Sequence, residues 1–449
     1  MAKLDILAAQ NMRMQPVRIC TLDLEYPATD LTAYDQETGK IYSDAWILVR
    51  LYGQPIGLET ISFDTEHISA TSLRDRIWKK YNARINAILQ DNGMKSLDYL
   101  RSDDFNARQF PSRTPPDQPF VSIIVCTRDR TEQLQRCLLS LSKQSYPSYE
   151  IIVVDNAPRT SDTANLLQER YKNARNVRYV RENRPGLSWA RNCGLHAAQG
   201  TIVAFTDDDV HTDSQWIERL VMAFDAAKNV VCVTGLTLPA ELETEAQLYF
   251  ERFGGFNKGC GFERAIYNLN DHRPLDPLFP YVGTKFGSGV NMAFRASFLR
   301  VTGGFDPALG TGMPSQGGEE AEVFFRVIDR GYSLVYEPGA IVWHYHRRDY
   351  TGLERQLHSY GIAFTAYLTR LILEDPRRIV DLILRTPSIL RYVLSPTSPR
   401  NSRKGIDFPH KLAHLELAGM LHGPLAYLRS RQIVRTTMRT SSIFDQSAS

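Results

Sequence analysis

Continuous apolar runs alternate with segments of helical periodicity through the middle of the chain. Runs rich in valine and isoleucine occupy 121–126, 151–154 and 202–206, and each is followed by a stretch in which apolar residues recur every three or four positions. An uninterrupted β-branched run is typical of a strand buried on both faces, and the alternation is typical of βαβ units. The pattern predicts an α/β domain over 120–350, with a doubly wound, mostly parallel sheet and helices on both of its faces.

The segments on either side of this domain have different patterns. Residues 1–110 predict a small α+β domain, with two short strands around a turn and then a helix over 72–93. A proline-rich linker at 111–119 separates it from the α/β domain. Residues 351–449 predict a helical region that ends in a disordered tail. Residues 240–290 lose the regular pattern, and a long irregular stretch inside a compact domain is usually functional.

The composition is that of an ordinary globular protein, but the charge is unevenly distributed. The 449 residues are 43% hydrophobic and 23% charged, and the net charge of +3 is too small for a dedicated nucleic-acid-binding protein. Residues 351–449 carry 14 Lys and Arg against 7 Asp and Glu, a net charge of +7, which leaves −4 on residues 1–350. The basic C-terminal region has two explanations: contact with an anionic partner such as a membrane surface, or a solvated helical face.

Neither the cysteines nor the apolar segments point to secretion. The six cysteines are scattered without a C-x-x-C pair, which favours a reducing compartment over a disulfide framework. The N-terminus lacks the apolar core of a signal peptide, and the apolar stretch at 360–373 is shorter than the roughly 20 residues of a membrane span. We therefore expect a cytoplasmic protein without a transmembrane helix, in which any membrane contact is peripheral, at the inner face, through the C-terminal region.

Carboxylates follow two of the predicted buried strands. Asp155 ends one run, and the triplet Asp207, Asp208 and Asp209 follows another. Because the carboxyl ends of parallel strands meet at one edge of the sheet, both groups are expected in one crevice. The spacing of Asp207 and Asp209 suits a hard divalent cation, Mg²⁺ or Mn²⁺, which would offset the repulsion between like charges. The alternative is a helix-capping role, for which one aspartate suffices and Asp213 is better placed.

Other residues have the chemistry of a catalytic site. Glu319 and Glu320 follow a Gly-Gly pair at the start of a predicted helix, where they suit either the helix dipole or a general base. His344 and His346 lie on one face of a strand end, as metal ligands or as satisfied core residues. Arg191, near a glycine turn and a helix start, is a candidate phosphate ligand.

The motifs of other nucleotide-binding classes are absent from the sequence. There is no G-x-x-x-x-G-K-[ST] loop, and the glycine-rich stretches at 259–264 and 287–292 do not open a helix after a buried strand. The sequence therefore disfavours both a P-loop NTPase and an ordinary dinucleotide dehydrogenase. A nucleotidyltransferase would carry a glycine-rich loop after the first strand, where this chain has CTRDR.

Seven motifs in sequence resemble those of a family 2 glycosyltransferase with the GT-A fold, over about 118–350. Any one of them is weak, but their order is specific. They are VSIIVCTRDRTEQLQRCLLSLSKQSYPSYEIIVVDN, RPGLSWARNCGL, AFTDDDV, GSGVNMAFR, GGFDPALG, GGEEAEVFFRVIDRGY and VWHYH.

The resemblance implies a binding side for a nucleotide-sugar co-substrate. Thr127 and Arg128 belong to the loop that would cradle the nucleotide after the first strand. Asp155 resembles the acid that accepts hydrogen bonds from the base, and Arg191 matches the arginine near the diphosphate. Asn291 would line the donor-sugar or acceptor side.

The resemblance also implies a metal centre that takes Mn²⁺ or Mg²⁺. Asp207 and Asp209 match the DxD motif, with Asp209 as the direct ligand and Asp207 or Asp208 nearer the ribose and phosphate. His344 resembles the further ligand that some GT-A enzymes add from a late strand.

One position departs from the family pattern. The family usually reads Glu-Asp where this chain reads Glu319-Glu320, and the Asp is the catalytic base. Glu320 occupies that position, but its extra methylene moves the carboxylate. Either the loop compensates, or Glu319 is the base. A base on the far side of the sugar implies a single displacement with inversion.

The sequence is thus expected to encode a metal-dependent, inverting glycosyltransferase of hexosyltransferase type. Its acceptor would be a hydroxyl of a glycan, a lipid-linked intermediate or a small molecule, in the synthesis of cell-surface polysaccharide or glycolipid. The alternative is a catalytically silent sugar-nucleotide-binding or scaffold subunit of a polysaccharide assembly complex. The nucleobase, the sugar, the linkage and the oligomeric state stay open.

Overall fold

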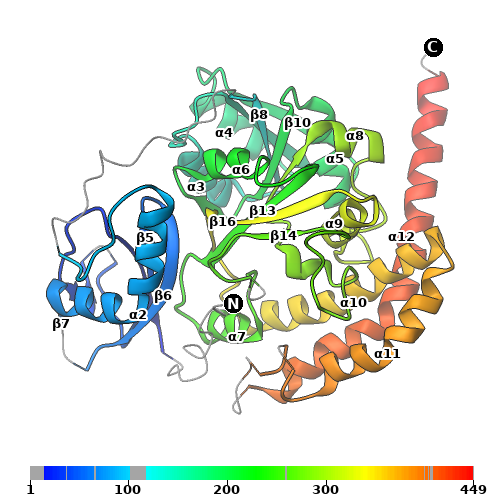
Figure 1. Cartoon of the computed structure of the whole chain (residues 1–449). Helices are drawn as coiled ribbons and strands as arrows, with labels where there is room; N and C mark the ends of the chain where they lie inside the picture. The colour runs from blue at the N-terminus through cyan, green and yellow to red at the C-terminus, as the bar shows by residue number, and fades with distance from the viewer. Residues whose placement is uncertain are drawn as a thin grey trace.

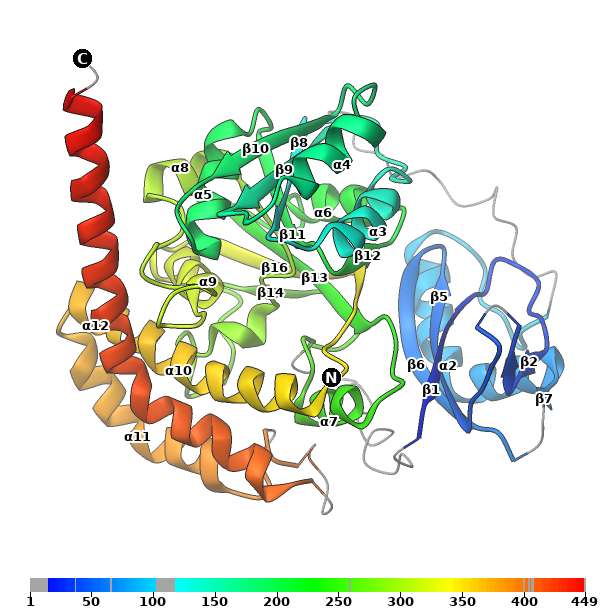
Figure 2. The same ribbon diagram turned by 180° about the vertical axis from the view of Figure 1, so that it is seen from behind.

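Three parts follow one another along the chain: an N-terminal unit, a central α/β domain and a C-terminal group of long helices (Figures 1 and 2). The computed structural model describes residues 15–447, except 37, 65–66, 102–117, 258–259, 399, 403 and 405–407. Of the linker expected at 111–119, only 118 and 119 are among the described residues, so the domain boundaries remain predictions.

The central domain is built on one nine-stranded sheet. Its strands are β8 (Val121–Thr127), β9 (Tyr149–Asn156), β10 (Val177–Glu182), β11 (Ile202–Asp207), β12 (Val210–Thr212), β13 (Val230–Pro239), β14 (Ala265–Tyr267), β15 (Asn291–Arg295) and β16 (Ser333–His344). The order is β10-β9-β8-β11-β15-β13-β16-β12, with β14 beside β16. β12, β14 and β15 run against the other strands. The predicted fold class, a doubly wound and mostly parallel α/β sheet, is confirmed.

Helices cover both faces of this sheet and enclose two hydrophobic cores. They are α3 (Thr131–Leu141), α4 (Asp162–Arg170), α5 (Leu187–Ala197), α6 (Trp216–Ala223), α8 (Ala296–Thr302) and α9 (Glu319–Asp329). Neighbouring residues of a strand point to opposite faces, so Ile123 packs with α3, α4 and α6, whereas Ile124 packs with α5, α8 and α9. Both faces are buried, which explains the uninterrupted apolar runs.

Residues 240–290 contain more regular structure than their composition indicates. They include α7 (Glu245–Phe253), β14 and the 3₁₀ helix η1 (Gly283–Phe286). Thr244 and Gln247 form a capping box at the start of α7, each side chain bonding the other residue's backbone.

The N-terminal unit packs against β13 and β16 of the central sheet. Its sheet has β1 (Val17–Asp23), β5 (Asp44–Leu51) and β6 (Gln54–Ser62), covered by α2 (Ala70–Asp91). Two small ladders pair β2 (Leu31–Thr32) with β7 (His67–Ile68) and β3 (Tyr34–Asp35) with β4 (Lys40–Ile41). Leu48 of β5 shares a buried cluster with Leu236 and Leu238 of β13.

The C-terminal part consists of α10 (Tyr350–Glu374), α11 (Arg378–Leu394) and α12 (His410–Ser447). α10 and α12 cross closely, because a Cβ at Gly361 would lie 1.9 Å from the Glu416 carbonyl oxygen and one at Gly419 would lie 2.1 Å from the His358 carbonyl oxygen. α12 runs into 441–449, where the sequence predicts a disordered tail. Among the described residues, no helix is apolar over enough length to cross a bilayer.

Candidate active site

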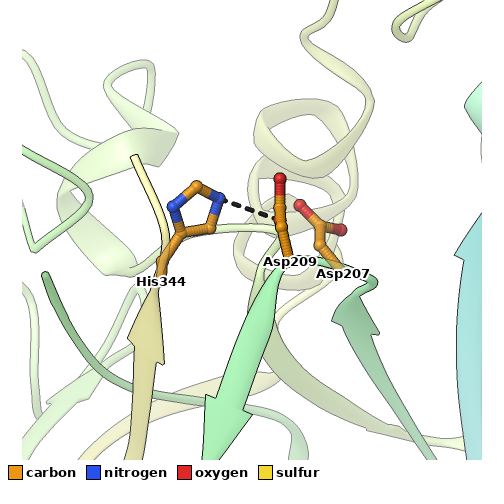
Figure 3. Close-up of side chains that lie close together, drawn as sticks. All are labelled: Asp207, Asp209 and His344. Carbon is orange, nitrogen blue, oxygen red and sulfur yellow. Dashed lines mark ion pairs between the residues drawn. The ribbon is translucent and has the colours of Figure 1, made fainter. Parts of the chain in front are cut away.

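The register of β12 against β16 brings two sequence-distant motifs together. Val210 pairs with His344, and the Tyr345 amide donates to the Asp209 carbonyl at 3.0 Å. The Asp209 side chain therefore meets the imidazole of His344, with Oδ1 and Nε2 3.1 Å apart (Figure 3). Asp207, at the end of β11, completes a cluster in which one ligand atom from each residue lies within 4.8 Å of the others.

The electrostatics of this cluster are strongly coupled. Burial would raise the pKa of Asp209, but the neighbouring His344 and Arg130 hold it well below its usual range. Burial likewise lowers the pKa of His344, but the Asp209 carboxylate more than offsets this and the net shift is upward. The pKa of Asp207 is raised, chiefly by burial, against the pull of Arg191. Without another cation, a positive charge on His344 is stabilised beside Asp209.

Asp208 faces away from this cluster. It is buried, accepts a hydrogen bond from the Thr127 hydroxyl at 2.7 Å and pairs with Arg130 at 3.1 Å. Burial and the neighbouring Asp209 raise the pKa of Asp208 to about 7. Arg130 also reaches Asp209 at 3.1 Å, so one guanidinium bridges two of the three aspartates.

A hydrogen-bonded chain continues behind His344. Its Nδ1 lies 3.0 Å from Nδ1 of His346, whose Nε2 lies 2.7 Å from Oε1 of Glu251 on α7. A carboxylate only accepts, so Nε2 of His346 carries the hydrogen, and burial lowers the pKa of His346, which favours the neutral ring. Its Nδ1 therefore accepts from Nδ1 of His344. When the His344 ring is neutral, this order leaves Nε2, the atom facing Asp209, free to ligate.

The two glutamates at the start of α9 have different surroundings. Glu319 is buried and pairs with the buried Arg191 at 2.8 Å, and Arg191 also lies 3.8 Å from Asp207. Glu320 is only partly buried, and no described residue forms an ion pair with it. Burial and the neighbouring Glu319 raise the pKa of Glu320 to about 8. Of the two, Glu320 is the carboxylate free to accept a proton.

These groups line one cavity of about 800 Å³. Its polar part includes the aspartate cluster with His344, both glutamates of α9, and Arg191. Thr127, Arg128 and Asn156 line it at the ends of β8 and β9. On the opposite side, its walls come from α10, α11 and the first half of α12.

Asp155, at the end of β9, is fully buried and does not line this cavity. The Tyr179 hydroxyl donates to its Oδ2 at 3.0 Å, whereas Oδ1 has no hydrogen bond from the described chain. Burial raises the pKa of Asp155, although the Tyr179 bond lowers it. An unsatisfied buried carboxylate oxygen is costly unless a partner arrives, which agrees with a ligand-binding role at this strand end.

The sequence profile described as Glycosyl transferase family 2 matches residues 122–302. These residues belong to glycosyltransferase family 2. The matched segment contains Asp155, Arg191 and the three aspartates, and it ends before α9 and His344.

Curated relatives of this glycosyltransferase domain include archaeal and mycobacterial proteins. The chain is 35% identical to the glycosyltransferase AglE of Haloferax volcanii over 22% of its own length and 34% of that protein. It is 25% identical to the glucosyl-dolichyl phosphate glucuronosyltransferase of the same organism over 50% of its length and 68% of that protein. It is 23% identical to the pre-mycofactocin glycosyltransferase of Mycobacterium tuberculosis over 62% of its length and 54% of that protein. The chain thus spans between 34% and 68% of the length of these relatives.

A solved structure was also found, the mannosyltransferase PcManGT from Pyrobaculum calidifontis in complex with GDP-Man and Mn²⁺. The similarity has a TM-score of 0.41 at 17% identity, over 84% of this chain and 89% of that one.

The structure of the glycosyltransferase domain brings most of the predicted site residues together around the cavity, but neither Asp155 nor Asn291 lines it. Asn291 is fully buried and donates to the carbonyls of Leu236 and Ala340 at 3.0 and 2.8 Å, while its Oδ1 accepts from Trp216 at 2.9 Å. These carbonyls lie where the β13–β16 register shifts, so Asn291 satisfies backbone groups at a bulge. All its polar atoms have protein partners, and it does not line the cavity.

The contacts of two further residues of the site are not predicted by the sequence. Arg130 belongs to the CTRDR loop expected to cradle the nucleotide, and in the structure it pairs with Asp208 and Asp209. Glu251 contacts His346 from α7, 95 residues away, and only the capping box at Thr244 indicates the helix that carries it.

Proposed function

We propose that this chain transfers a sugar from a nucleotide-sugar to a hydroxyl acceptor, with inversion, and that a divalent cation takes part. The observation that carries the proposal is the convergence, in one cavity of a family 2 domain, of the Asp207–Asp209–His344 cluster, Arg191 and the unpaired Glu320.

The residues of the cluster fit a divalent cation. Two carboxylates and one imidazole offer ligand atoms within 4.8 Å of one another. The Asp207 side chain is 32% exposed, so phosphate oxygens and water can complete the coordination. Carboxylates suit Mg²⁺ and Mn²⁺ alike, and the imidazole nitrogen favours Mn²⁺. When bound, the cation would neutralise the negative charge that grows on the leaving diphosphate.

Arg191 and Asp155 would hold the donor. Arg191 lies between Glu319 and Asp207, so its guanidinium is fixed at the polar end of the cavity where a diphosphate would lie. Asp155 has one unsatisfied oxygen to accept a hydrogen bond from the nucleobase. Glu319 orients Arg191 and is not the base in this assignment.

Glu320 would act as the general base. It accepts the proton of the acceptor hydroxyl while that oxygen forms its bond to the anomeric carbon. The bond from that carbon to the diphosphate breaks, and the nucleoside diphosphate leaves with the electron pair. Because attack and departure occur on opposite faces, the configuration inverts. A pKa near 8 makes Glu320 a stronger base than an exposed glutamate.

Among the three acceptor classes, a lipid-linked hydroxyl has the most support. One similar protein is named for transfer to glucosyl-dolichyl phosphate, and the present chain covers 68% of it. The cavity beside Glu320 is walled by apolar side chains of α10 and α11, which suits an acceptor with an apolar portion. A glycan or a small hydroxyl compound would use the same base.

The test begins with a thermal-shift screen against UDP-, GDP- and dTDP-sugars with Mn²⁺, followed by hydrolysis of the stabilising donor. Wild type should hydrolyse that donor slowly without acceptor. Glu320→Gln should bind it and lose most of the turnover. Glu132→Gln is the matched control, since Glu132 is the second residue of α3, as Glu320 is of α9, but lies away from the cavity. Equal turnover in Glu320→Gln and wild type would refute the assignment of the base.

The second candidate is the catalytically silent sugar-nucleotide-binding or scaffold subunit. It is favoured by one observation, the glutamate at the position where the family usually has aspartate. Donor binding without any hydrolysis by the wild-type chain, with each metal tested, would support this candidate over the enzyme.

A further inference from the structure

α11 is apolar on both faces, yet none of its residues is buried. A helix of a soluble protein normally buries its apolar side and exposes a polar one. Figures 1 and 2 show α11 beside α12 at the end of the molecule opposite the N-terminal unit. The fold accounts for the apolar residues on one face of α11, but it does not account for those on the other face.

The inner face of α11 lines the cavity. Leu382, Ile389, Tyr392 and Val393 contribute to its wall. Arg385 on the same face donates to the Phe279 carbonyl at 3.1 Å. This side of α11 is therefore accounted for by the cavity and by contacts with the central domain.

The outer face of α11 has no partner in the described structure. Ile383 is 63% exposed and Leu384 is 75% exposed. The full set of exposed large apolar residues on α11 is Ile379, Val380, Ile383, Leu384, Leu390 and Leu394. A contiguous apolar helix face of this kind marks an interaction site and not a scattered surface residue.

The charges around this face are basic. Arg391 on α11 is exposed and has no ion-pair partner among the described residues, and the same holds for Arg429 and Arg435 on α12. Exposed leucines accompany the arginines on α12, with Leu421 83% and Leu425 53% exposed. The whole segment 351–449 has a net charge of +7. Apolar side chains interleaved with arginines suit an anionic lipid surface, whereas a second copy would oppose like charges.

We propose that the outer face of α11, with the exposed leucines and arginines of α12, docks peripherally on an anionic phospholipid bilayer. Apolar side chains would enter the boundary between headgroups and acyl chains, and the arginines would contact the headgroups. Docking itself does not depend on the proposed function. If that function holds, α11 contacts the bilayer with one face and walls the acceptor side of the cavity with the other, so a membrane-borne acceptor would reach Glu320 along it.

The test is flotation of the full chain with two kinds of vesicle, phosphatidylcholine alone and phosphatidylcholine with phosphatidylglycerol. Wild type should float with the anionic vesicles and less with the neutral ones. Ile383→Glu with Leu384→Glu should lower the partition coefficient about tenfold or more. Arg391→Glu should weaken binding to anionic vesicles only. Val301→Glu is the matched control, because Val301 is 83% exposed on α8, away from this face, and should float as wild type does.

Each other outcome has a definite meaning. If wild type does not float with either vesicle, docking is refuted. If it forms a dimer in solution that the Ile383→Glu, Leu384→Glu variant abolishes, and does not float, the face is an interface between copies. Flotation without turnover of any nucleotide-sugar would refute the proposed function and leave docking standing. Turnover of a nucleotide-sugar without flotation would refute docking and leave the proposed function standing.

Discussion

Glu251 is expected to control the affinity of the site for a divalent cation, although it lies two hydrogen bonds behind the ligand position. Replacing it by leucine removes the acceptor 2.7 Å from Nε2 of His346. The hydrogen of His346 is then free to occupy Nδ1, which faces Nδ1 of His344 at 3.0 Å. His344 would in that case carry its own hydrogen on Nε2, the atom that must be free to ligate.

The size of the effect follows from this geometry. Loss of an outer partner of a metal-binding histidine typically costs 10–100-fold in metal affinity. Because Glu251 acts through an intervening ring, we expect the lower end, about tenfold, which corresponds to about 1.4 kcal/mol. Glu251→Gln should lose less, since its amide oxygen still accepts from His346. Gly255→Ala should resemble Glu251→Leu, because a Cβ there would lie 2.5 Å from Oε1 of Glu251.

The assay is a Mn²⁺ titration with a nucleoside diphosphate present, in which free Mn²⁺ is read by electron paramagnetic resonance. Glu243→Leu is the control: Glu243 precedes α7 and pairs with Arg348, but has no contact with either histidine. Affinity in Glu251→Leu equal to that in the control would refute the reasoning. A lower melting temperature with unchanged Mn²⁺ affinity would show that Glu251 serves only to hold α7.

Three further predictions concern the cluster and its support. Mn²⁺ with a nucleoside diphosphate should raise the melting temperature of wild type, and Asp209→Ala should abolish that rise; an equal rise in the variant would exclude Asp209 as a ligand. Because the pKa of Glu320 is raised to about 8 and the base must be ionised, kcat/KM should rise with pH through that region. Glu319→Gln removes a neighbouring negative charge and should move the rise to lower pH, and a pH profile that does not move would contradict this cause. Gly318→Ala should cost about 1–3 kcal/mol in chemical unfolding, more than Gly303→Ala, since both have φ near +90° but only the first Cβ meets backbone, at 2.8 Å.

The buried strands were predictable because their signal is local. The runs at 121–126, 151–154 and 202–206 are apolar except for Ser122 and Thr206, and the structure buries them on both faces. The strand ends were then enough to place Asp155 and Asp207 at one edge, because parallel strands share a direction. The strand-end position of His344 suggested a metal ligand or a core residue, and only the resemblance linked it to the aspartates.

What the sequence did not predict depends on pairings between distant segments. The antiparallel insertion of β15 between β11 and β13 turns Asn291 into the core, where it satisfies carbonyls at a bulge. No local pattern distinguishes that role from one facing a ligand. The relay through Glu251 requires α7 to lie against the end of β16, a contact that neither segment encodes alone. Which of the two glutamates pairs with an arginine, and which is the base, likewise depends on the position of Arg191 beside Glu319.

The repulsion expected among the aspartates is met in the first place by the protein's own cations, each from a different element. Arg130, from the loop after β8, pairs with both Asp208 and Asp209. Arg191 from α5 lies near Asp207, and His344 from β16 faces Asp209. A divalent ion is thus not needed to explain why the turn is stable. What distinguishes the cation position is geometry: among the described residues, ligand atoms of Asp207, Asp209 and His344 lie within 4.8 Å of one another, whereas both oxygens of Asp208 are engaged by Thr127 and Arg130. Asp208 instead serves to hold the loop after β8, on which the nucleotide is expected to bind.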